Sequence, residues 1–383
     1  MEERSKISLL PFVSVIVLNH NGRKWLQECF SSLLKLDYPK DRLEIMMGDN
    51  ASTDDSIAYT TANFPTVKIV KIIKNYGFCK SNNLCAQEAN GEYLVFLNND
   101  TFVTAGWLKA LVLGLRSESN VLSCASKILI PYLENGRVIN AAGGVISPAG
   151  CGFYDGCFEL DSPKYGMGKN TGFGCGAGVL IEKKFFIETG GFDEYYFYSG
   201  EEMDLGYRVW THGGKVRYVS EAVMFHYMGG TGFRGNGVTP ITEFLIMRNG
   251  LYFILKNFEW YGVVQGLALF FMRTTAKVGY ALIHFNVKIL LSILKAHWVV
   301  LKDLQKILIQ RKRQQITRKI SDDVLRQNDI LISWKEFFQR NFNLLRQIQR
   351  YQQGKVYDVR DKFEIKIDES GDWLFQPLQK IEG

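Results

Sequence analysis

The sequence lacks the features that mark a membrane span or a disulfide-bonded protein. Its longest unbroken apolar stretch falls well short of the roughly 20 residues needed to cross a bilayer. Its amino terminus is charged at Glu2, Glu3, Arg4 and Lys6 and has no apolar core of a signal peptide. The seven cysteines are an odd number, are scattered, and form no Cys-x-x-Cys pair. We therefore expect reduced thiols in a cytoplasmic protein rather than a disulfide framework or a zinc site.

Acidic residues are scarce in one segment of the chain. Residues 271–320 contain eleven Lys and Arg but a single acid, Asp303. The remainder has 35 basic and 38 acidic residues, so this segment carries the whole basic excess behind the net charge of +7. No internal repeat and no nucleic-acid recognition module is recognisable, and we expect no nucleic-acid partner. With 383 residues, 46% of them hydrophobic, the chain can form one large domain plus an extension.

Strand and helix patterns alternate along the first hundred residues. Short apolar and β-branched runs predict four strands, at 13–18, 43–47, 67–73 and 93–97. Apolar residues at helical spacing predict helices at 24–36 and 80–89. This alternation predicts an α/β fold with a mostly parallel sheet, helices on both faces and right-handed crossovers.

The pattern loosens after a predicted helix at 107–115. Glycine is frequent from residue 135 to residue 178, which predicts irregular loops beside a site. Regular structure returns as strands at 178–181, 215–219 and 222–225 and as helices at 201–211 and 243–258. Near the end of the chain, alternation at 363–367 predicts a strand, and residues 370–372 could turn it into a second.

Polar residues follow each of the first four predicted strands. They are Asn19 to Asn21, Asp49 with Asn50, Asn75 to Gly77, and Asn98 to Asp100. Because the carboxyl ends of parallel strands meet at one edge of a sheet, we expect these groups to converge on a single crevice. Asp100, flanked by amides, suits a divalent cation that shares its shell with a diphosphate. The alternative is that each group merely forms a turn.

Together with later motifs, these residues resemble a known family. The early motifs are 13–21, 48–54, 75–78 with Asn83, and 97–100; the later ones are 190–194, 201–205, Arg208 and His226. In this order they are similar to the inverting family 2 glycosyltransferases, and most similar to the branch that includes rhamnosyltransferases. The resemblance covers roughly residues 12 to 255. It implies a GT-A fold, which is Rossmann-like, and an enzyme that takes a sugar from a nucleoside diphosphate.

The resemblance also implies a donor site and a metal site. Its nucleotide-sugar positions are Leu18, Asn19, His20, Asn21, Asp49, Asn50, Asn75, Gly77, Asn83, Asn98 and Asn99. Asp100 matches the last carboxylate of the family's Asp-x-Asp motif, so it would be the main protein ligand of Mg²⁺ or Mn²⁺. His226 matches a late histidine beside the metal or the leaving diphosphate, although a solitary histidine at a strand end can equally be structural.

The base that the resemblance implies is the second acid of a Glu-Asp pair, a position held here by Glu202. At a helix amino terminus the dipole favours the ionised form that a base requires. Because glutamate is one methylene longer than the usual aspartate, Glu201 is an alternative base. Alternatively, Glu201 and Glu202 only satisfy the amino terminus of the helix and have no catalytic role. For Asp204 and Arg208, at i and i+4, we expect an ion pair on the helix surface.

The last third of the chain predicts a helical extension with basic and apolar faces. Apolar residues from 260 to 301 are interrupted by Arg273, Lys277, His284, Lys288, Lys295 and His297. Such helices suit an anionic membrane surface, where each Lys or Arg contributes about 1 kcal/mol. We therefore expect residues 260–320 to lie peripherally on the inner face of the cell membrane. The alternative is a hairpin packed on the catalytic domain.

These expectations divide the chain into three parts. A GT-A catalytic domain occupies 1–258, with a nucleotide-binding half at 12–100 and an acceptor half at 101–258. A basic amphipathic helical extension follows at 259–350, and a short strand-containing tail at 351–383.

The expected function is inverting transfer of a sugar from a dTDP- or UDP-sugar, with rhamnose as one candidate. The acceptor would be a glycan or a lipid-linked chain in cell-surface polysaccharide synthesis. The alternative is a non-catalytic scaffold on the same fold that binds sugar nucleotides or glycans, since Asn98 and Glu202 depart from the family pattern.

Overall fold

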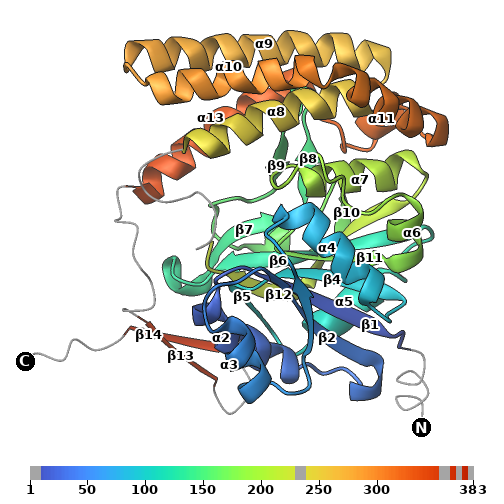
Figure 1. Ribbon diagram of the computed structural model, residues 1–383, viewed down its shortest axis with the longest axis vertical. Coiled ribbons are helices and arrows are strands. Elements are labelled where there is room, and N and C mark those ends of the chain that lie inside the picture. The colour runs from blue at the N-terminus through green and yellow to red at the C-terminus, as the bar shows by residue number, and fades with distance from the viewer. Residues whose placement is uncertain (1–9, 229–238, 353–362, 368–372, 378–383) are drawn as a thin grey trace, which may run out of the picture.

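A ten-stranded mixed sheet lies at the centre of the protein (Figure 1). The structure is a computed structural model that describes residues 10–228, 239–352, 363–367 and 373–377. The strands of the sheet are β1 (Val13–Asn19), β2 (Leu43–Asn50), β3 (Lys68–Ile72), β4 (Tyr93–Asn98), β5 (Thr101–Val103), β6 (Val121–Ile130), β7 (Val138–Ala142), β10 (Lys169–Thr171), β11 (Gly178–Glu182) and β12 (Lys215–His226). Along the main path their order is β10-β12-β6-β11-β4-β1-β2-β3.

The first four strands are parallel, as the sequence predicts. β1 pairs with β2 and β4, and β2 pairs with β3. Both faces of this half are buried: Val15 lies in a core with α2 (Arg23–Leu34), and Ile16 lies in a core with α4 (Gly77–Glu88). Burial on both faces explains the nearly continuous apolar runs that predicted these strands. Their ends differ from the predicted ends by at most three residues.

The prediction of a mostly parallel sheet is wrong for the other half. β11 runs antiparallel to both β4 and β6, and β5, β7 and β10 also pair in antiparallel fashion. Only β12 and β6 are parallel there. A parallel neighbour needs a long crossover, whereas β6 and β7 are joined by a short connection that permits an antiparallel return.

Several elements were not expected from the sequence. The ten-residue strand β6 lies inside the sheet, and the stretch predicted as irregular loops contains β7, β10 and a separate hairpin, β8 (Gly144–Ile146) with β9 (Gly152–Tyr154). The remaining helices of the catalytic part are α3 (Ser56–Asn63), α5 (Trp107–Gly114), α6 (Lys183–Glu188) and α7 (Glu201–Thr211). The bounds of α7 are those that the sequence predicts.

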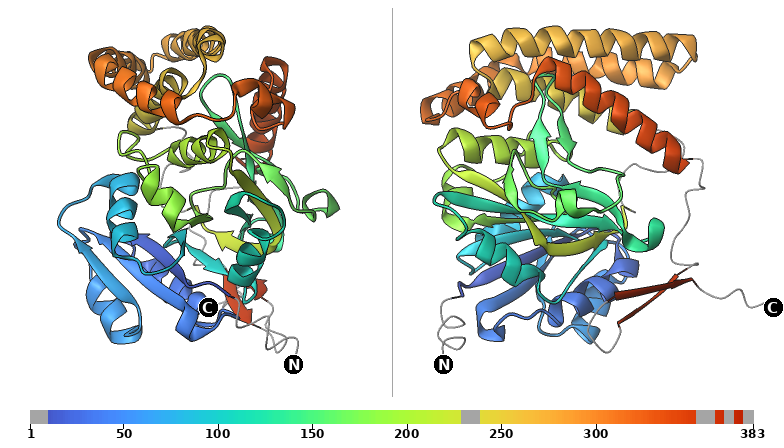
Figure 2. Two further views of the ribbon diagram at one scale, coloured as in Figure 1. Left: turned by 90° about the vertical axis from the view of Figure 1, so that its right-hand side faces the viewer. Right: turned by 180° about the vertical axis from the view of Figure 1, so that it is seen from behind.

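Six further helices follow the sheet. They are α8 (Pro240–Asn257), α9 (Trp260–Ile283), α10 (Val287–Lys302), α11 (Leu304–Thr317), α12 (Asp322–Gln327) and α13 (Trp334–Gln352). α9 and α10 form a hairpin on α8, at the end of the molecule opposite β2 and β3 (Figures 1 and 2). This packing agrees with the alternative expectation for the extension. Among the described helices, none combines the length and the hydropathy of a membrane span.

A second hairpin lies close to the end of the chain. β13 (Phe363–Ile367) pairs antiparallel with β14 (Trp373–Pro377), which confirms the predicted strand at 363–367. The predicted turn at 370–372 lies outside the described residues.

Candidate active site

The ends of β1, β2 and β4 are joined by side-chain hydrogen bonds. Asn19 Oδ1 accepts a hydrogen bond of 2.7 Å from Asn99 Nδ2, and Asn19 Nδ2 donates to Ser52 Oγ at 3.1 Å. Asp49 accepts the backbone N–H of Ser52 at 3.1 Å. Strand register places Asn19 opposite Asp49 and Leu18 opposite Asn98. The structure therefore brings these predicted residues to one edge of the sheet.

Asn50 organises the loop that leads into α4. Its Oδ1 accepts from the Tyr76 N–H at 3.0 Å and from the Ser81 hydroxyl at 2.7 Å. Its Nδ2 donates to Asn75 Oδ1 at 2.9 Å and to the Gly77 carbonyl at 3.3 Å. Gly77 has a φ of +79°, which other residues adopt only with strain. Asn50, Asn75 and Gly77 thus act as one unit that shapes this side of the crevice.

The loop after β1 is fastened to the loop after β2. The Nδ1 atom of His20 lies 2.9 Å from the Asn50 carbonyl, and the His20 side chain is exposed. Asn21 Oδ1 accepts the N–H groups of Thr53 at 2.7 Å and Asp54 at 3.3 Å. His20, Asn21, Thr53 and Asp54 are all exposed, so this joined pair of loops forms a solvent-facing edge of the crevice.

Two predicted donor-site residues have other contacts. Asn83 forms a pair of 2.8 Å hydrogen bonds with the backbone N–H and carbonyl of Phe192, which ties α4 to the turn before α7. Because both ends of its amide are used, we interpret Asn83 as a positioning residue. Leu18 packs against the core beneath β2, where it closely approaches Gly48.

The two predicted metal ligands are brought together. Asp100 is 4% exposed and His226, the last residue of β12, has its Nε2 atom 3.3 Å from Asp100 Oδ1. His226 Nδ1 lies 2.9 Å from Asn140 Oδ1, to which it can donate a hydrogen bond. Nε2 faces Asp100, and with the proton on Nδ1 its lone pair is available to a cation that Asp100 also binds.

The donor set fits a cation that is shared with a substrate. No cluster of three or more His, Cys, Asp or Glu suitable for a metal occurs among the described residues. A carboxylate and an imidazole alone do not complete the six-coordinate shell of Mg²⁺ or Mn²⁺. The remaining ligands would have to be water and diphosphate oxygens, which is how Mg²⁺ is commonly bound at phosphate sites.

The two candidate bases differ in environment. Glu202 Oε1 accepts a hydrogen bond of 2.7 Å from the Tyr154 hydroxyl, while Glu202 Oε2 is buried without a partner in the described structure. Glu201 is 6% exposed, and burial together with the neighbouring Glu202 raises its pKa well above the ordinary value of 4.5. A carboxyl group that retains its proton cannot act as a general base. The burial of Glu201 and the hydrogen bond that orients Glu202 therefore favour Glu202 over Glu201.

The turn before β11 connects the metal strand with the acidic pair. The N–H of Asn98 donates to the Ala177 carbonyl at 3.1 Å. One residue earlier, a Cβ added at Gly176 would lie 3.9 Å from both Glu201 Oε1 and Glu202 Cβ. The carboxyl end of β4 and the amino end of α7 thus border the same short turn, and the two halves of the candidate site are neighbours.

Asp204 and Arg208 form an ion pair, but the expectation of a surface pair is wrong. Both are buried, and Arg208 Nε lies 2.9 Å from Asp204 Oδ2. Lys256 and Asn257 of α8 approach Asp204 Oδ1 at 2.7 and 2.8 Å. Burial alone would raise the pKa of Asp204, but Lys256 and Arg208 overcome it and lower the pKa to about 2. The pair is internal because α8 packs over α7.

The sequence assigned no role in the site to four residues that position it. Tyr154 and Asn140 lie in the region predicted as irregular and carry no motif of their own. Arg248 donates to the carbonyls of Tyr195 and Tyr196 at 2.7 and 2.8 Å, and Asn249 donates to the carbonyls of the next residues, 198 and 199. These bonds hold the loop that leads into α7, and the adjacent Arg-Asn pair was their only signal in the sequence.

Comparisons with known proteins identify the fold and a family. Residues 14–148 match the model of Glycosyl transferase family 2. The O-antigen biosynthesis protein RfbC of Myxococcus xanthus is 29% identical over 227 residues, which cover 57% of this chain and 17% of that protein. The chain spans less than half the length of the curated relatives it matches first.

Two solved structures have a similar fold. GalNAc-T7 with UDP, GalNAc and Mn²⁺ has a TM-score of 0.53 at 20% identity, over 66% of this chain and 49% of that chain. Residues 1–349 of S. aureus TarS in complex with UDP-GlcNAc have a TM-score of 0.50 at 18% identity, over 94% of this chain and 98% of that chain. At these identities the likeness establishes the GT-A fold, which the sequence predicted.

Proposed function

We propose that this chain, whose residues 14–148 match the model of Glycosyl transferase family 2, is an inverting enzyme of that family. It would transfer a sugar from a nucleoside diphosphate to a hydroxyl group of a glycan or lipid-linked acceptor. The observation that carries this proposal is that Asn98, two residues before Asp100, and Glu202 border the same turn at Gly176 and Ala177. The UDP and UDP-GlcNAc bound to the similar structures support a uridine nucleotide donor.

The residues of the first half bind and orient the donor. Asp100 and His226 would hold Mg²⁺ or Mn²⁺, which when bound neutralises the charge that develops on the departing diphosphate. The loops at Asn19, Asp49 and Asn50 are already cross-linked to each other, so they present backbone groups to the nucleotide with little reorganisation. Mn²⁺ in the GalNAc-T7 structure supports a divalent cation here.

Glu202 takes the proton of the acceptor. Tyr154 fixes Oε1, so Oε2 is the oxygen that remains for the acceptor hydroxyl. The hydroxyl proton passes to Oε2 as the acceptor oxygen bonds to the anomeric carbon. The bond from that carbon to the diphosphate breaks, and its electron pair leaves with the diphosphate. Attack opposite the leaving group inverts the anomeric configuration, and no protein nucleophile takes part.

We further propose that the α9–α10 hairpin rests on the inner face of the cell membrane. Its outer surface is apolar, with exposed side chains at Val287, Leu291, Leu294, Trp298 and Leu301 of α10 and at Val264 and Phe271 of α9. On α10 these residues recur at spacings of four and three, and a row of exposed lysines adjoins them at Lys288, Lys295 and Lys302. Residues 260–302 contain five Lys or Arg and no acid, so an anionic lipid surface complements them and a second copy would repel them.

The decisive experiment measures nucleotide release and donor binding together. UDP-, dTDP- and GDP-sugars are incubated with the full chain and Mg²⁺ or Mn²⁺, and we expect one donor class to release its nucleotide. Glu202→Gln should retain donor binding but lose transfer by about 10² to 10⁴, the usual contribution of a general base. A wild-type protein that binds a donor but never turns it over would instead be a scaffold. Full transfer by Glu202→Gln would remove the assignment of the base.

A further inference from the structure

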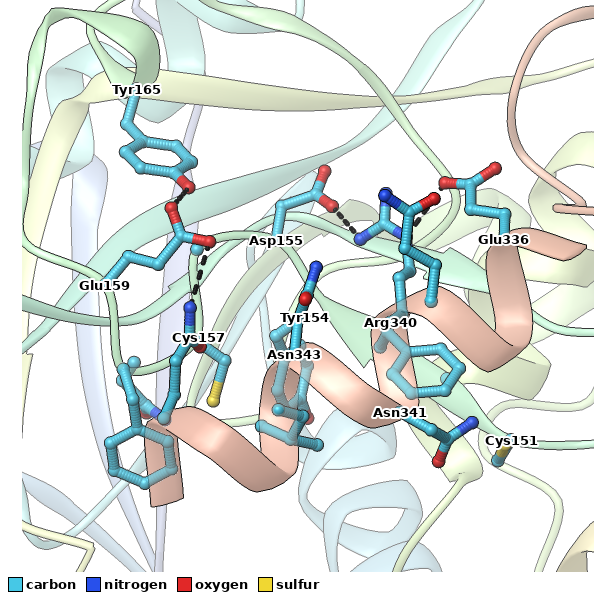
Figure 3. Close-up of a pocket in the computed structure, with 18 of the residues that line it drawn as sticks. Cys151, Tyr154, Asp155, Cys157, Glu159, Tyr165, Glu336, Arg340, Asn341 and Asn343 are labelled. Carbon is cyan, nitrogen blue, oxygen red and sulfur yellow. Dashed lines mark hydrogen bonds and ion pairs between the residues drawn. The ribbon is translucent and has the colours of Figure 1, made fainter. Parts of the chain in front are cut away.

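A groove lies between the β9 region and α13, outside the loops that border the donor crevice (Figure 3). Residues 151–159 form one wall, and residues on one side of α13 form the other. Its volume is about 840 Å³, within the range of about 300–1,000 Å³ that is typical of ligand sites. No residue at the ends of β1, β2 or β4 lines it. The groove is therefore separate from the proposed donor loops.

The groove adjoins the proposed reaction centre through two of its lining residues. Asn140 lines the groove and contacts His226, which in turn lies beside Asp100. Tyr154 also lines the groove, and its hydroxyl donates to Glu202. A ligand in the groove is thus separated from the candidate metal pair and from the candidate base by one side chain each.

One face of α13 offers a row of polar groups to this groove. Lys335, Gln339, Asn343 and Gln347 line it at successive intervals of four residues, which places them on one side of the helix. The first three are exposed and have no hydrogen-bond partner within the described part of the chain. Amide side chains both donate and accept hydrogen bonds, so this row suits a ligand with many hydroxyl groups.

The opposite wall is fixed by ion pairs and hydrogen bonds. Asp155 is held by Lys169 at 2.6 Å and by Arg340 of α13 at 2.7 Å, and Arg340 also pairs with Glu336 at 2.9 Å (Figure 3). Glu159 accepts from Tyr165 and from Gln347. These contacts hold the two walls in position before a ligand arrives, which lowers the entropy that binding costs.

We propose that this groove, the acceptor groove, binds the hydroxyl-rich chain of the acceptor, a glycan or a polyol chain. The terminal hydroxyl lies at Glu202, and the following units lie along α13 between its amide row and the wall at Asp155. The proposal rests on the proposed glycosyl transfer. It gives α13, which follows the catalytic sheet by more than a hundred residues, the role of an acceptor-binding element.

The test separates acceptor binding from donor chemistry. The full chain is applied to an array of defined oligosaccharides and polyol phosphates, and dissociation constants are measured for the chains that bind. The double variant Gln339→Ala and Asn343→Ala and the single variant Lys335→Ala remove exposed groups of the groove. Arg346→Ala, an exposed cation of the same helix that does not line the groove, is the matched control. Donor hydrolysis without acceptor and thermal melting are measured for every variant.

We expect the groove variants to weaken binding of the chain at least tenfold and to raise its KM in transfer. Donor hydrolysis and melting should stay at wild-type values, and Arg346→Ala should bind normally. Wild-type binding by the groove variants, or no binding of any chain by a wild-type protein that hydrolyses donor, would overturn the acceptor groove. If the wild-type protein binds a chain through these residues but hydrolyses no donor, the acceptor groove stands and the proposed transfer fails.

Discussion

The Tyr154 hydroxyl donates to Glu202 Oε1 at 2.7 Å, and this bond joins the β9 strand to the first turn of α7. It fixes one carboxylate oxygen and thereby directs the other. We predict that Tyr154→Phe lowers kcat by about tenfold, because the base loses its orientation while its charge remains. Donor binding should be unchanged.

Transfer kinetics and donor titration check this prediction. Tyr38→Phe is a matched control, since its hydroxyl donates to the Pro11 carbonyl at 2.6 Å, far from the site. An unchanged kcat in Tyr154→Phe would show that the orientation of Glu202 does not depend on this bond.

Glu201 should make stability depend on pH. Its pKa is raised in the folded state, so the folded protein holds this proton more tightly than the unfolded chain. Stability is therefore lost as pH rises above about 4.5, the value in the unfolded chain, by up to ~1.4 kcal/mol per pH unit until the folded pKa is reached. Glu201→Gln should be as stable as the wild type near pH 4 and more stable near pH 8.

Urea unfolding at several pH values measures this difference. The control is Glu188→Gln, which removes an exposed carboxylate at the end of α6 and should leave the pH dependence unaltered. A constant difference between Glu201→Gln and wild type across this range would argue against a proton held at Glu201.

The titration of Asp204 should affect the pH dependence of stability in the direction opposite to that of Glu201. Its pKa of about 2 in the folded state lies below the ordinary value of 3.8, so its stabilisation is present above about pH 4 and is lost as pH falls towards 2. Asp204→Asn leaves Lys256 and Arg208 without their shared partner, and we expect a loss of about 3–5 kcal/mol in the free energy of unfolding. Lys306→Ala, which breaks an exposed pair with Asp303, should change it by less than about 1 kcal/mol.

Chemical denaturation of the variants at pH 7 measures both changes. Equal stabilities of Asp204→Asn and Lys306→Ala would contradict a buried network around α7 and α8.

The metal pair can be tested without turnover. UDP with Mn²⁺ should raise the melting temperature of the wild-type protein more than UDP alone, because a ligand that binds only the folded state stabilises it. Asp100→Asn and His226→Asn should lose this extra increase. His284→Asn, an exposed histidine on the α9–α10 connection, serves as control. Retention of the increase in both site variants would place the cation elsewhere.

Vesicle sedimentation tests the proposed membrane contact. The protein should sediment with vesicles of phosphatidylglycerol and phosphatidylcholine, much less with phosphatidylcholine alone, and less at high salt. Trp298→Ser should weaken binding severalfold, since it removes a large exposed side chain from the apolar surface of α10. Ile73→Ser, which removes an even more exposed apolar side chain beside β3, should not weaken it. If Trp298→Ser binds as well as Ile73→Ser and the wild type, or if binding does not depend on lipid charge, the proposal is contradicted.

The sequence predicted the first half of the sheet because its strands are buried on both faces and read as apolar runs. It missed β6, although that strand is also buried, because Ser123, Ser126 and Lys127 interrupt the pattern. Their polar groups are satisfied across the fold: Ser123 and Ser126 donate to carbonyls of β11, and Lys127 pairs with Asp161. Partners this distant in sequence leave no local signal.

The candidate site likewise contains residues that the sequence located and residues that it did not. Motifs at strand ends located Asp49 and Asp100, since topology alone brings such ends together, and the family resemblance located Glu202. Asn140 reaches the site because β7 pairs with β6, and Tyr154 reaches it because the separate β8–β9 hairpin meets α7. The burial of Asp204 also depends on tertiary structure, since α8 packs over it.

Arg273 of α9 lines the acceptor groove, so the hairpin with the apolar outer surface also contributes to the proposed binding site of the acceptor. If that apolar surface rests on the membrane, the glycan of a lipid-linked acceptor would extend from the membrane into the groove along α13. The water-borne nucleotide would enter from the opposite side, past β1 and β2. The lipid-linked acceptor would then enter from the membrane and the nucleotide sugar from water, so the fold would give the two substrates separate entry routes.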